Sequence, residues 1–271
     1  MSFLPDETLR HLREVAAEPD LSGTRYTLQR EIGRGGLGVV WAVQDRELDR
    51  IVALKVADRE EACTIARLDH PGIVPVHDSG QLRDGRAYYV MKLVDGVRLD
   101  RHQAPLNERL RLFLKVCDAV AFAHSRGVVH RDLKPANLMV GRFGEVYVMD
   151  WGLPGTGTAG FMAPEQARGE AADQRSDVPA LGAVLTGLTG TERPLQAIAR
   201  RAQAALPEER YPSVTELAAD VARYLDRERV LAYRESLAER AGRFAARNSV
   251  LLLLLAAYVV VRLALFFLRP V

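Results

Sequence analysis

Two hydrophobic patterns divide most of the chain. Between residues 26 and 94, apolar and polar positions largely alternate, and many apolar ones are β-branched or aromatic, which is typical of strands. One intervening segment, EEACTIARL, instead has helical spacing. The pattern predicts five strands around one inserted helix, in the sequences RYTLQREIG, GVVWAVQD, RIVALKVA, IVPVHDSGQL and RAYYVMKLV.

The pattern becomes helical after DGVRL. Residues 107–125 carry Leu110, Leu114 and Val120 on one stripe. Two short strand candidates, NLMV and VYVMD, follow a polar loop. Further helices are expected at about 178–188, 195–205 and 214–224. A small β-rich lobe followed by a larger helical lobe is an α+β arrangement.

The ends of the chain differ from this body. Residues 1–25 are expected to be a leader with a short amphipathic helix at 5–17. The leader lacks the basic start and apolar run of a secretory signal. Residues 250–268 are apolar except for Arg262, and about 20 such residues are enough to cross a bilayer. The sequence therefore predicts a transmembrane helix at 249–268, with Arg262 reaching outward to the interface.

A basic segment at 227–248 precedes this predicted span. It is expected to continue as a helix to the membrane, which either contacts anionic lipid or remains a solvated charged helix. The excess of arginines on this side favours an inner-membrane protein whose preceding residues are cytoplasmic. The arginines that carry this argument are Arg229, Arg234, Arg240, Arg243 and Arg247.

Composition sets only broad limits. Apolar residues make up 48% and charged residues 27%, so the chain can form a core. A net charge of +2 gives no reason to expect a nucleic-acid partner. Cys63 and Cys117 have no metal-ligand spacing and are expected to be reduced.

Two early motifs fit phosphate binding but remain ambiguous alone. Gly33, Gly35 and Gly38 lie between two strands, where they either fold over phosphates or form an ordinary turn. Lys55 interrupts an apolar strand, and a lysine there is costly unless it is paired. It either holds phosphates or points to solvent from an edge strand.

The stronger signals are VVHRDLKPANLMV and VYVMDWG. They bring together the oxygen-bearing side chains of Asp132, Asn137 and Asp150. Such oxygens, with substrate phosphates, suit Mg²⁺. Asp132 occupies a pattern in which aspartate accepts a hydroxyl proton and asparagine binds metal.

With these motifs in order, the chain resembles the eukaryotic-like, or Hanks-type, protein serine/threonine kinases of bacteria. The resemblance implies a bilobal protein-kinase-like domain at 26–226, with lobes at 26–94 and 95–226, and ATP with Mg²⁺ or Mn²⁺ as cofactors. The implied nucleotide-binding positions are Ile32, Gly33, Arg34, Gly35, Gly36, Leu37, Gly38, Val39, Val40, Ala53, Lys55, Met91, Lys92, Val94, Asn137 and Asp150. Asn137 and Asp150 are the implied metal ligands.

The resemblance also implies roles in phosphoryl transfer to protein Ser/Thr hydroxyls. Asp132 would orient or deprotonate the hydroxyl, Lys134 would steady the γ-phosphate, and Thr158 would help to select Ser or Thr. Lys55 would hold phosphates, with Glu61 as its partner.

Further implied contacts are structural. Glu165 would pair with Arg210, and Asp177 would anchor the catalytic loop. Trp151, which stands where the family usually has phenylalanine, would pack beside His130 and Ile65.

Several segments are shorter than the family pattern. Glu61 follows Lys55 so closely that it could instead form a capping box with Asp58, leaving Glu60 as a substitute partner. Residues 153–162 form a short loop whose only hydroxyl residues are Thr156 and Thr158. The chain after Gly182 is also compressed. Two other functions therefore stay open: a pseudokinase-like nucleotide-binding scaffold and a small-molecule kinase, against which Thr158 and the APE segment argue. The oligomeric state is undetermined.

Overall fold

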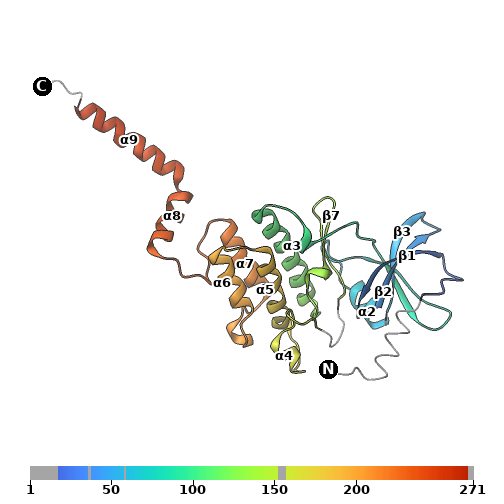
Figure 1. Ribbon diagram of the computed structural model, residues 1–271. Helices are drawn as coiled ribbons and strands as arrows, with labels where there is room; N and C mark the ends of the chain where they lie inside the picture. Colours follow the sequence, from blue (N-terminus) through green and yellow to red (C-terminus); the bar gives the residue numbers. More distant parts are fainter. Residues whose placement is uncertain (1–17, 36–37, 58, 152–156, 268–271) are drawn as a thin grey trace.

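The protein has two lobes, and strands gather in one while helices fill the other (Figure 1). The computed structural model describes residues 18–35, 38–57, 59–151 and 157–267. The helix predicted at 5–17 and the positions Gly36, Leu37, Asp58 and Thr156 lie outside the described residues. The predicted α+β arrangement is confirmed.

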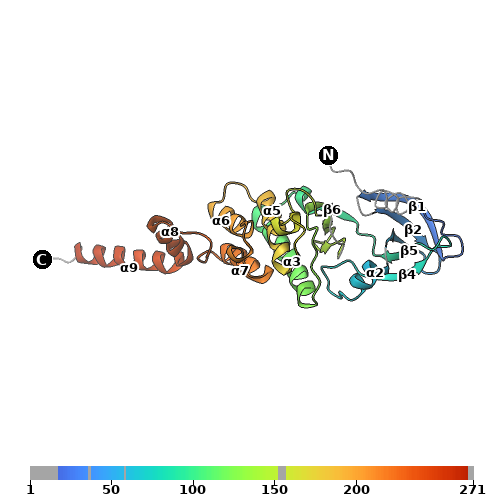
Figure 2. The ribbon, with the colours of Figure 1, turned by 90° about the horizontal axis from the view of Figure 1, so that it is seen from below.

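The smaller lobe is a five-stranded antiparallel sheet in the order β1-β2-β3-β5-β4. Its helix, α2 (Arg59–Ala66), packs beside β4 and β5 (Figure 2). Both the predicted strands and the inserted helix are present. The strand bounds are β1 (Tyr26–Gly35), β2 (Gly38–Asp45), β3 (Arg50–Val56), β4 (Val76–Gln81) and β5 (Ala87–Met91).

The strand register separates the two faces of this sheet. Val40 pairs with Lys55, and Ala53 pairs with Met91. Directly paired residues project from the same face, so these side chains share a face. Neighbouring residues such as Val39 and Trp41 project from the other face, where they belong to the hydrophobic core of this lobe.

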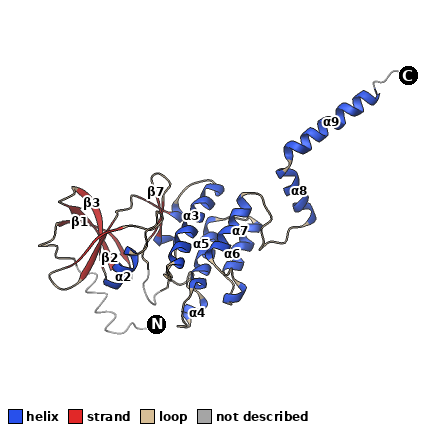
Figure 3. Cartoon of the chain, turned by 180° about the vertical axis from the view of Figure 1, so that it is seen from behind, coloured by secondary structure: helices blue, strands red, loops and turns tan. Residues whose placement is uncertain are grey.

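The larger lobe combines helices with a small three-stranded sheet (Figure 3). The sheet contains β6 (Gly96–Arg98), β7 (Leu138–Gly141) and β8 (Val146–Val148). The α-helices are α3 (Leu106–Ser125), α4 (Pro164–Ala167), α5 (Asp177–Leu188), α6 (Arg193–Ala202) and α7 (Val214–Leu225). Short 3₁₀ turns lie at Leu99–Arg101, Pro135–Asn137, Gln174–Ser176 and Pro207–Glu209. Phe113, Leu181 and Leu217 are fully buried between α3, α5 and α7.

The compressed segment of the sequence corresponds to a direct connection between helices. Only residues 189–192 separate α5 from α6. Pro179 is the third residue of α5, where a proline is tolerated because its missing N–H has no partner in the first turn. The expectation that this helix begins close to Pro179 is confirmed.

The predicted continuous helix at 227–248 is wrong. Helix α8 (Leu237–Arg247) begins only after Ser236, which caps it together with Glu239. The preceding residues pack back against the helical lobe, and Val230 is buried. Their backbone hydrogen bonds to α7 compete successfully with helix formation.

Helix α9 (Ser249–Phe267) projects away from the helical lobe, on the side opposite the β-rich lobe (Figures 1 and 2). Among the described residues, none of the helices has the combined length and apolarity needed to cross a membrane. The predicted transmembrane helix at 249–268 is therefore not supported. Residue 268 and the side chains at 249, 251 and 264–267 lie outside the description.

Candidate active site

Lys55 makes two ion pairs inside the protein. Its side chain is almost fully buried on β3, and Nζ donates to Glu61 Oε1 at 2.9 Å and to Asp150 Oδ1 at 2.9 Å. A buried ammonium group is tolerated only with such partners. The prediction that Lys55 pairs with Glu61 is confirmed, and the solvent-facing alternative is wrong.

Glu61 lies in the first turn of α2 with its side chain turned inward. Its Oε1 also accepts a hydrogen bond from the buried Tyr89 hydroxyl at 2.9 Å. Glu60 is exposed, so it does not substitute for Glu61. Sequence reasoning missed Tyr89. The available signal was its place in β5, directly opposite Lys55.

The charges of this cluster depend on one another. Burial alone lowers the pKa of Lys55, but the Asp150 and Glu61 carboxylates outweigh it and raise the net pKa. Burial raises the pKa of Glu61, although Lys55 opposes this effect. Burial also acts to raise the pKa of Asp150, but the charge of Lys55 outweighs it and lowers the pKa below its usual value. Lys55 and Asp150 are therefore charged at neutral pH.

Asp177 organises the loop that carries Asp132. From the start of α5, its carboxylate accepts the backbone N–H groups of His130 and Arg131, both at 2.8 Å. These bonds hold Arg131 in a left-handed conformation, with φ of 69°. The predicted anchoring role of Asp177 is confirmed. His124 Nε2 also lies 2.7 Å from Oδ2 of the Asp177 carboxylate.

His130 supports the same loop as a neutral side chain. Burial lowers its pKa. Its Nε2 lies 2.9 Å from the Met149 carbonyl, which can only accept, so Nε2 carries the proton. Nδ1 is then free to accept the backbone N–H of Asp132 at 3.3 Å. His130 therefore links the loop that carries Asp132 to the segment after β8 that leads to Asp150.

Asp132, Lys134 and Thr158 form one hydrogen-bonded group. Lys134 Nζ donates to Asp132 Oδ2 at 2.7 Å, and the Thr158 hydroxyl donates to Oδ1 at 2.8 Å. Lys134 also donates to Thr158 Oγ1 at 2.8 Å. The structure thus brings together three predicted catalytic side chains, from the loop before β7 and from the segment before α4.

Asn137 and Asp150 suit a hard divalent ion. Asn137 donates its amide N–H to the Asp132 carbonyl at 2.9 Å, which fixes its orientation and leaves its side-chain oxygen as an acceptor. Asp150 is ionised and accepts from Lys55 through one of its two oxygens, Oδ1. No group of three His, Cys, Asp or Glu side chains in the described residues could hold a metal ion alone. The donor set therefore fits Mg²⁺ if nucleotide phosphates complete the coordination.

Comparisons with known proteins match this arrangement. A family model described as "Protein kinase domain" matches residues 26–227. The chain belongs to the protein kinase family. The match covers both lobes and ends just after α7.

The kinase is also similar to curated mycobacterial proteins. It is 33% identical to serine/threonine-protein kinase PknB of Mycolicibacterium smegmatis over 272 residues, covering 76% of this chain and 44% of PknB. It is 39% identical to serine/threonine-protein kinase PknA of Mycobacterium tuberculosis over 209 residues, covering 64% of this chain and 48% of PknA. The alignments thus span less than half the length of these relatives.

The other residues that are predicted to bind nucleotide do not all project from the same face of the sheet. Ala53, Val40 and Met91 lie on the face of the sheet that carries Lys55. The prediction that the Val39 side chain contacts nucleotide is wrong, because this side chain is buried in the core on the opposite face of the sheet. The alternation along β2 could have revealed this.

The glycine-rich end and the interlobe connection hold the other candidates. Lys92 uses its backbone N–H for the Pro75 carbonyl at 3.2 Å, so we expect adenine contact through its carbonyl. The Lys92 side chain donates to the Tyr147 hydroxyl, linking the connection to β8. The Arg34 guanidinium group donates two hydrogen bonds to the Glu31 carboxylate. Ile32, Gly33 and Gly35 lie in β1, Gly38 begins β2, and Val94 follows β5.

Two predicted structural contacts support the kinase site. Glu165 and Arg210 form a buried bidentate pair, with both N···O distances at 2.7 Å. Trp151 packs against His130, with ring centroids 4.7 Å apart, and lies in the same core cluster as Ile65. The Glu165–Arg210 pair and the packing of Trp151 against His130 are confirmed.

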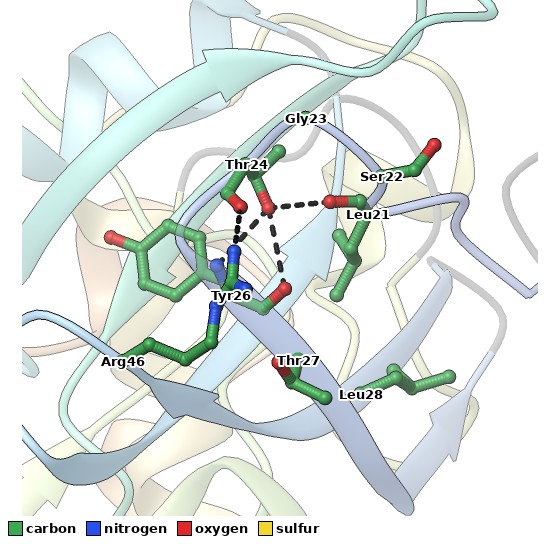
Figure 4. Close-up of a pocket in the computed structure, with 8 residues that line it drawn as sticks. All are labelled: Leu21, Ser22, Gly23, Thr24, Tyr26, Thr27, Leu28 and Arg46. Atoms are coloured by element: carbon green, nitrogen blue, oxygen red, sulfur yellow. Dashed lines mark hydrogen bonds between the residues drawn. The ribbon is translucent and has the colours of Figure 1, made fainter.

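A surface cavity of about 320 Å³ lies elsewhere, between the leader and the beginning of β1 (Figure 4). Its polar atoms bind one another: Arg46 donates to the Thr24 carbonyl at 2.7 Å, and Thr24 donates to the Leu21 carbonyl at 2.8 Å. Tyr26, in its lining, pairs with the end of β2 far from the glycine-rich turn. The cavity therefore lies apart from the interlobe site.

Proposed function

We propose that this chain is an ATP-dependent protein serine/threonine kinase, which transfers the γ-phosphate of ATP to Ser or Thr hydroxyls. The observation that carries the proposal is the Asp132, Lys134 and Thr158 group, together with the Lys55, Glu61 and Asp150 cluster. Its relatives PknB and PknA are named as serine/threonine-protein kinases, which is consistent with this activity.

The proposed transfer is an in-line displacement. The substrate hydroxyl oxygen bonds to the γ-phosphorus, while the bond from this phosphorus to the β–γ bridging oxygen breaks and ADP leaves. Asp132 accepts the hydroxyl proton, and Lys134 offsets negative charge on the γ-phosphoryl oxygens. Lys55 orients the α- and β-phosphates. A Mg²⁺ or Mn²⁺ ion held by Asn137 and Asp150 would neutralise phosphate charge.

One alternative is a scaffold that binds nucleotide but transfers phosphate poorly. It is favoured by the short α2 and by the direct connection between α5 and α6. Calorimetry with Mg·ATP and transfer of radiolabelled γ-phosphate separate the two functions. Binding with transfer supports the kinase, whereas binding without transfer to itself or to general acceptor proteins supports the scaffold.

We also propose that α9 attaches the kinase to a lipid bilayer on the cytoplasmic side. All residues at 252–263 are exposed, and side chains such as Leu253, Val260 and Tyr258 are apolar or amphipathic. Burial of such a surface in lipid is favourable, and the exposed Arg240 of α8 would face anionic headgroups.

Membrane attachment can be measured by cell fractionation of the full chain and of a chain lacking 250–271. The full chain should sediment with membranes and resist a high-salt wash, whereas the deleted chain should be in the supernatant. Recovery of the full chain in the supernatant would refute the attachment. Release by salt alone would mean that arginine contacts, rather than α9, provide the binding.

A further inference from the structure

The two tryptophans of the chain differ in one respect. Both Trp41 and Trp151 are buried, at 8% and 1% exposure. Among the residues that the structure describes, the indole Nε1 of Trp41 has no hydrogen-bond partner. The Nε1–H of Trp151 donates to the Val148 carbonyl at 3.0 Å. Trp151 therefore has a polar contact beyond the packing of its rings.

This hydrogen bond spans a strained turn. Asp150 lies between the two bonded residues and has a left-handed backbone, with φ of 59°. Such a conformation is unfavourable for a residue with a side chain and persists only when its surroundings hold it. The Trp151–Val148 bond closes a ring across Asp150 and so opposes relaxation of the turn.

Both ends of that ring are fixed to the rest of the protein. Val148 donates its backbone N–H to the Gly72 carbonyl at 2.8 Å and pairs with Leu138 in the small sheet. The Trp151 rings pack against His130. The turn between these fixed ends presents Asp150 to Lys55 at 2.9 Å.

We propose that the indole N–H of Trp151 is a positioning group, which holds Asp150 in the orientation needed to bind a divalent ion together with nucleotide phosphates. The inference rests on the proposed function, since it concerns the metal site of the kinase. In this role Trp151 acts through the turn at Asp150 and is not itself a metal ligand. Its packing could be supplied by phenylalanine, but its hydrogen bond could not.

The test compares Trp151→Phe with Trp41→Phe as a matched control. Each substitution removes one buried indole N–H, but within the described part of the chain only the first breaks a hydrogen bond. Calorimetry measures binding of a non-hydrolysable ATP analogue over a range of Mg²⁺ concentrations. For Trp151→Phe, the Mg²⁺ concentration that half-saturates binding of the analogue should rise about threefold to tenfold. The loss of one hydrogen bond shifts the equilibrium between the competent and the relaxed turn by a factor of this size.

Saturating Mg²⁺ should restore analogue binding, because metal binding shifts the turn back to the competent orientation. Trp41→Phe should leave the Mg²⁺ dependence within about twofold of the original chain. An unchanged Mg²⁺ dependence in Trp151→Phe, or an equal rise in both variants, would overturn the proposal. A parent chain that binds Mg·nucleotide but transfers no phosphate would instead refute the proposed function alone.

A second measurement does not require Trp151→Phe to fold. In the parent chain labelled with ¹⁵N-tryptophan, the two indole signals are assigned with Trp41→Phe. Exchange of the Trp151 indole proton with solvent should slow further when Mg²⁺ and the analogue bind, because the metal stabilises the same turn. Exchange that is fast and unaffected by Mg²⁺ would contradict the positioning role.

Discussion

Glu60 and Glu61 are neighbours in the first turn of α2, but only Glu61 faces the protein interior. Glu61→Gln removes the charge that orients Lys55, so kcat/KM for phosphoryl transfer should fall about tenfold to a hundredfold. Glu60→Gln should leave kcat/KM unchanged within about twofold. Steady-state kinetics of both variants would test the pairing, and equal losses would contradict it.

The Glu165–Arg210 pair should make stability depend on pH. Arg210 holds the pKa of Glu165 at about 2, below its ordinary value of 4.5. Because the folded-state pKa is the lower one, the stabilisation is full above about pH 4.5 and is lost as pH falls toward 2. Chemical denaturation should show a decrease of about 3 kcal/mol in the unfolding free energy from this group.

Substitution of Arg210 tests how much the same ion pair contributes to stability. Arg210 is fully buried and also donates to the carbonyls of Ala204 and Ala205. Lysine keeps the charge but cannot reproduce this bidentate geometry, so Arg210→Lys should cost about 1–3 kcal/mol of unfolding free energy at pH 7 and weaken the acid dependence. The exposed pair of Arg168 and Glu170 is the control, and Arg168→Lys should cost less than about 1 kcal/mol.

The family resemblance implied which charged residues form pairs, including Lys55 with Glu61 and Glu165 with Arg210. It did not predict contacts that depend on side-chain direction. Tyr89 was missed because its hydroxyl reaches Glu61 only across the strand pairing of β3 and β5. The hydrogen bond of Trp151 was missed because it depends on the left-handed backbone at Asp150.

At the scale of whole elements, periodicity predicted every strand of the β-rich lobe and most helices of the other lobe. It failed for the segment before α8, where the composition suits a helix but tertiary contacts prevail. The fully buried Asp220 of α7 accepts the backbone N–H groups of Leu231 and Ala232 at 2.7 and 3.0 Å. It also accepts the Tyr211 hydroxyl at 2.8 Å. A sequence pattern does not reveal that such distant donors converge on one carboxylate.

This contact predicts that the folded unit extends beyond α7. Asp220→Asn places an amide opposite donor groups and should lower the unfolding free energy by about 2 kcal/mol or more. Limited proteolysis between residues 228 and 236 should accelerate at the same time. Asp226→Asn, at an exposed position just after α7, should change neither property. Normal protease resistance in Asp220→Asn would show that this carboxylate does not hold the segment.

At the scale of the whole molecule, the two lobes contribute different residues to the proposed active site. The β-rich lobe contributes Lys55 and Glu61, and the helical lobe contributes Asp132 and Asn137. Asp150 joins them by contacting Lys55 across the lobes. The sequence predicted this division because each motif lies within one pattern of periodicity, but the separation and orientation of the lobes depend on packing that no motif encodes.

The central claim is that these residues of the two lobes form one site for phosphoryl transfer to Ser and Thr. It is tested most directly by the rate of γ-phosphate transfer from radiolabelled ATP to a general acceptor protein, followed by phosphoamino-acid identification. We predict phosphoserine or phosphothreonine, and a fall of about a hundredfold or more in Asp132→Asn. An equal rate in Asp132→Asn, or no transfer by the original chain with Mg²⁺ or Mn²⁺, would contradict the claim.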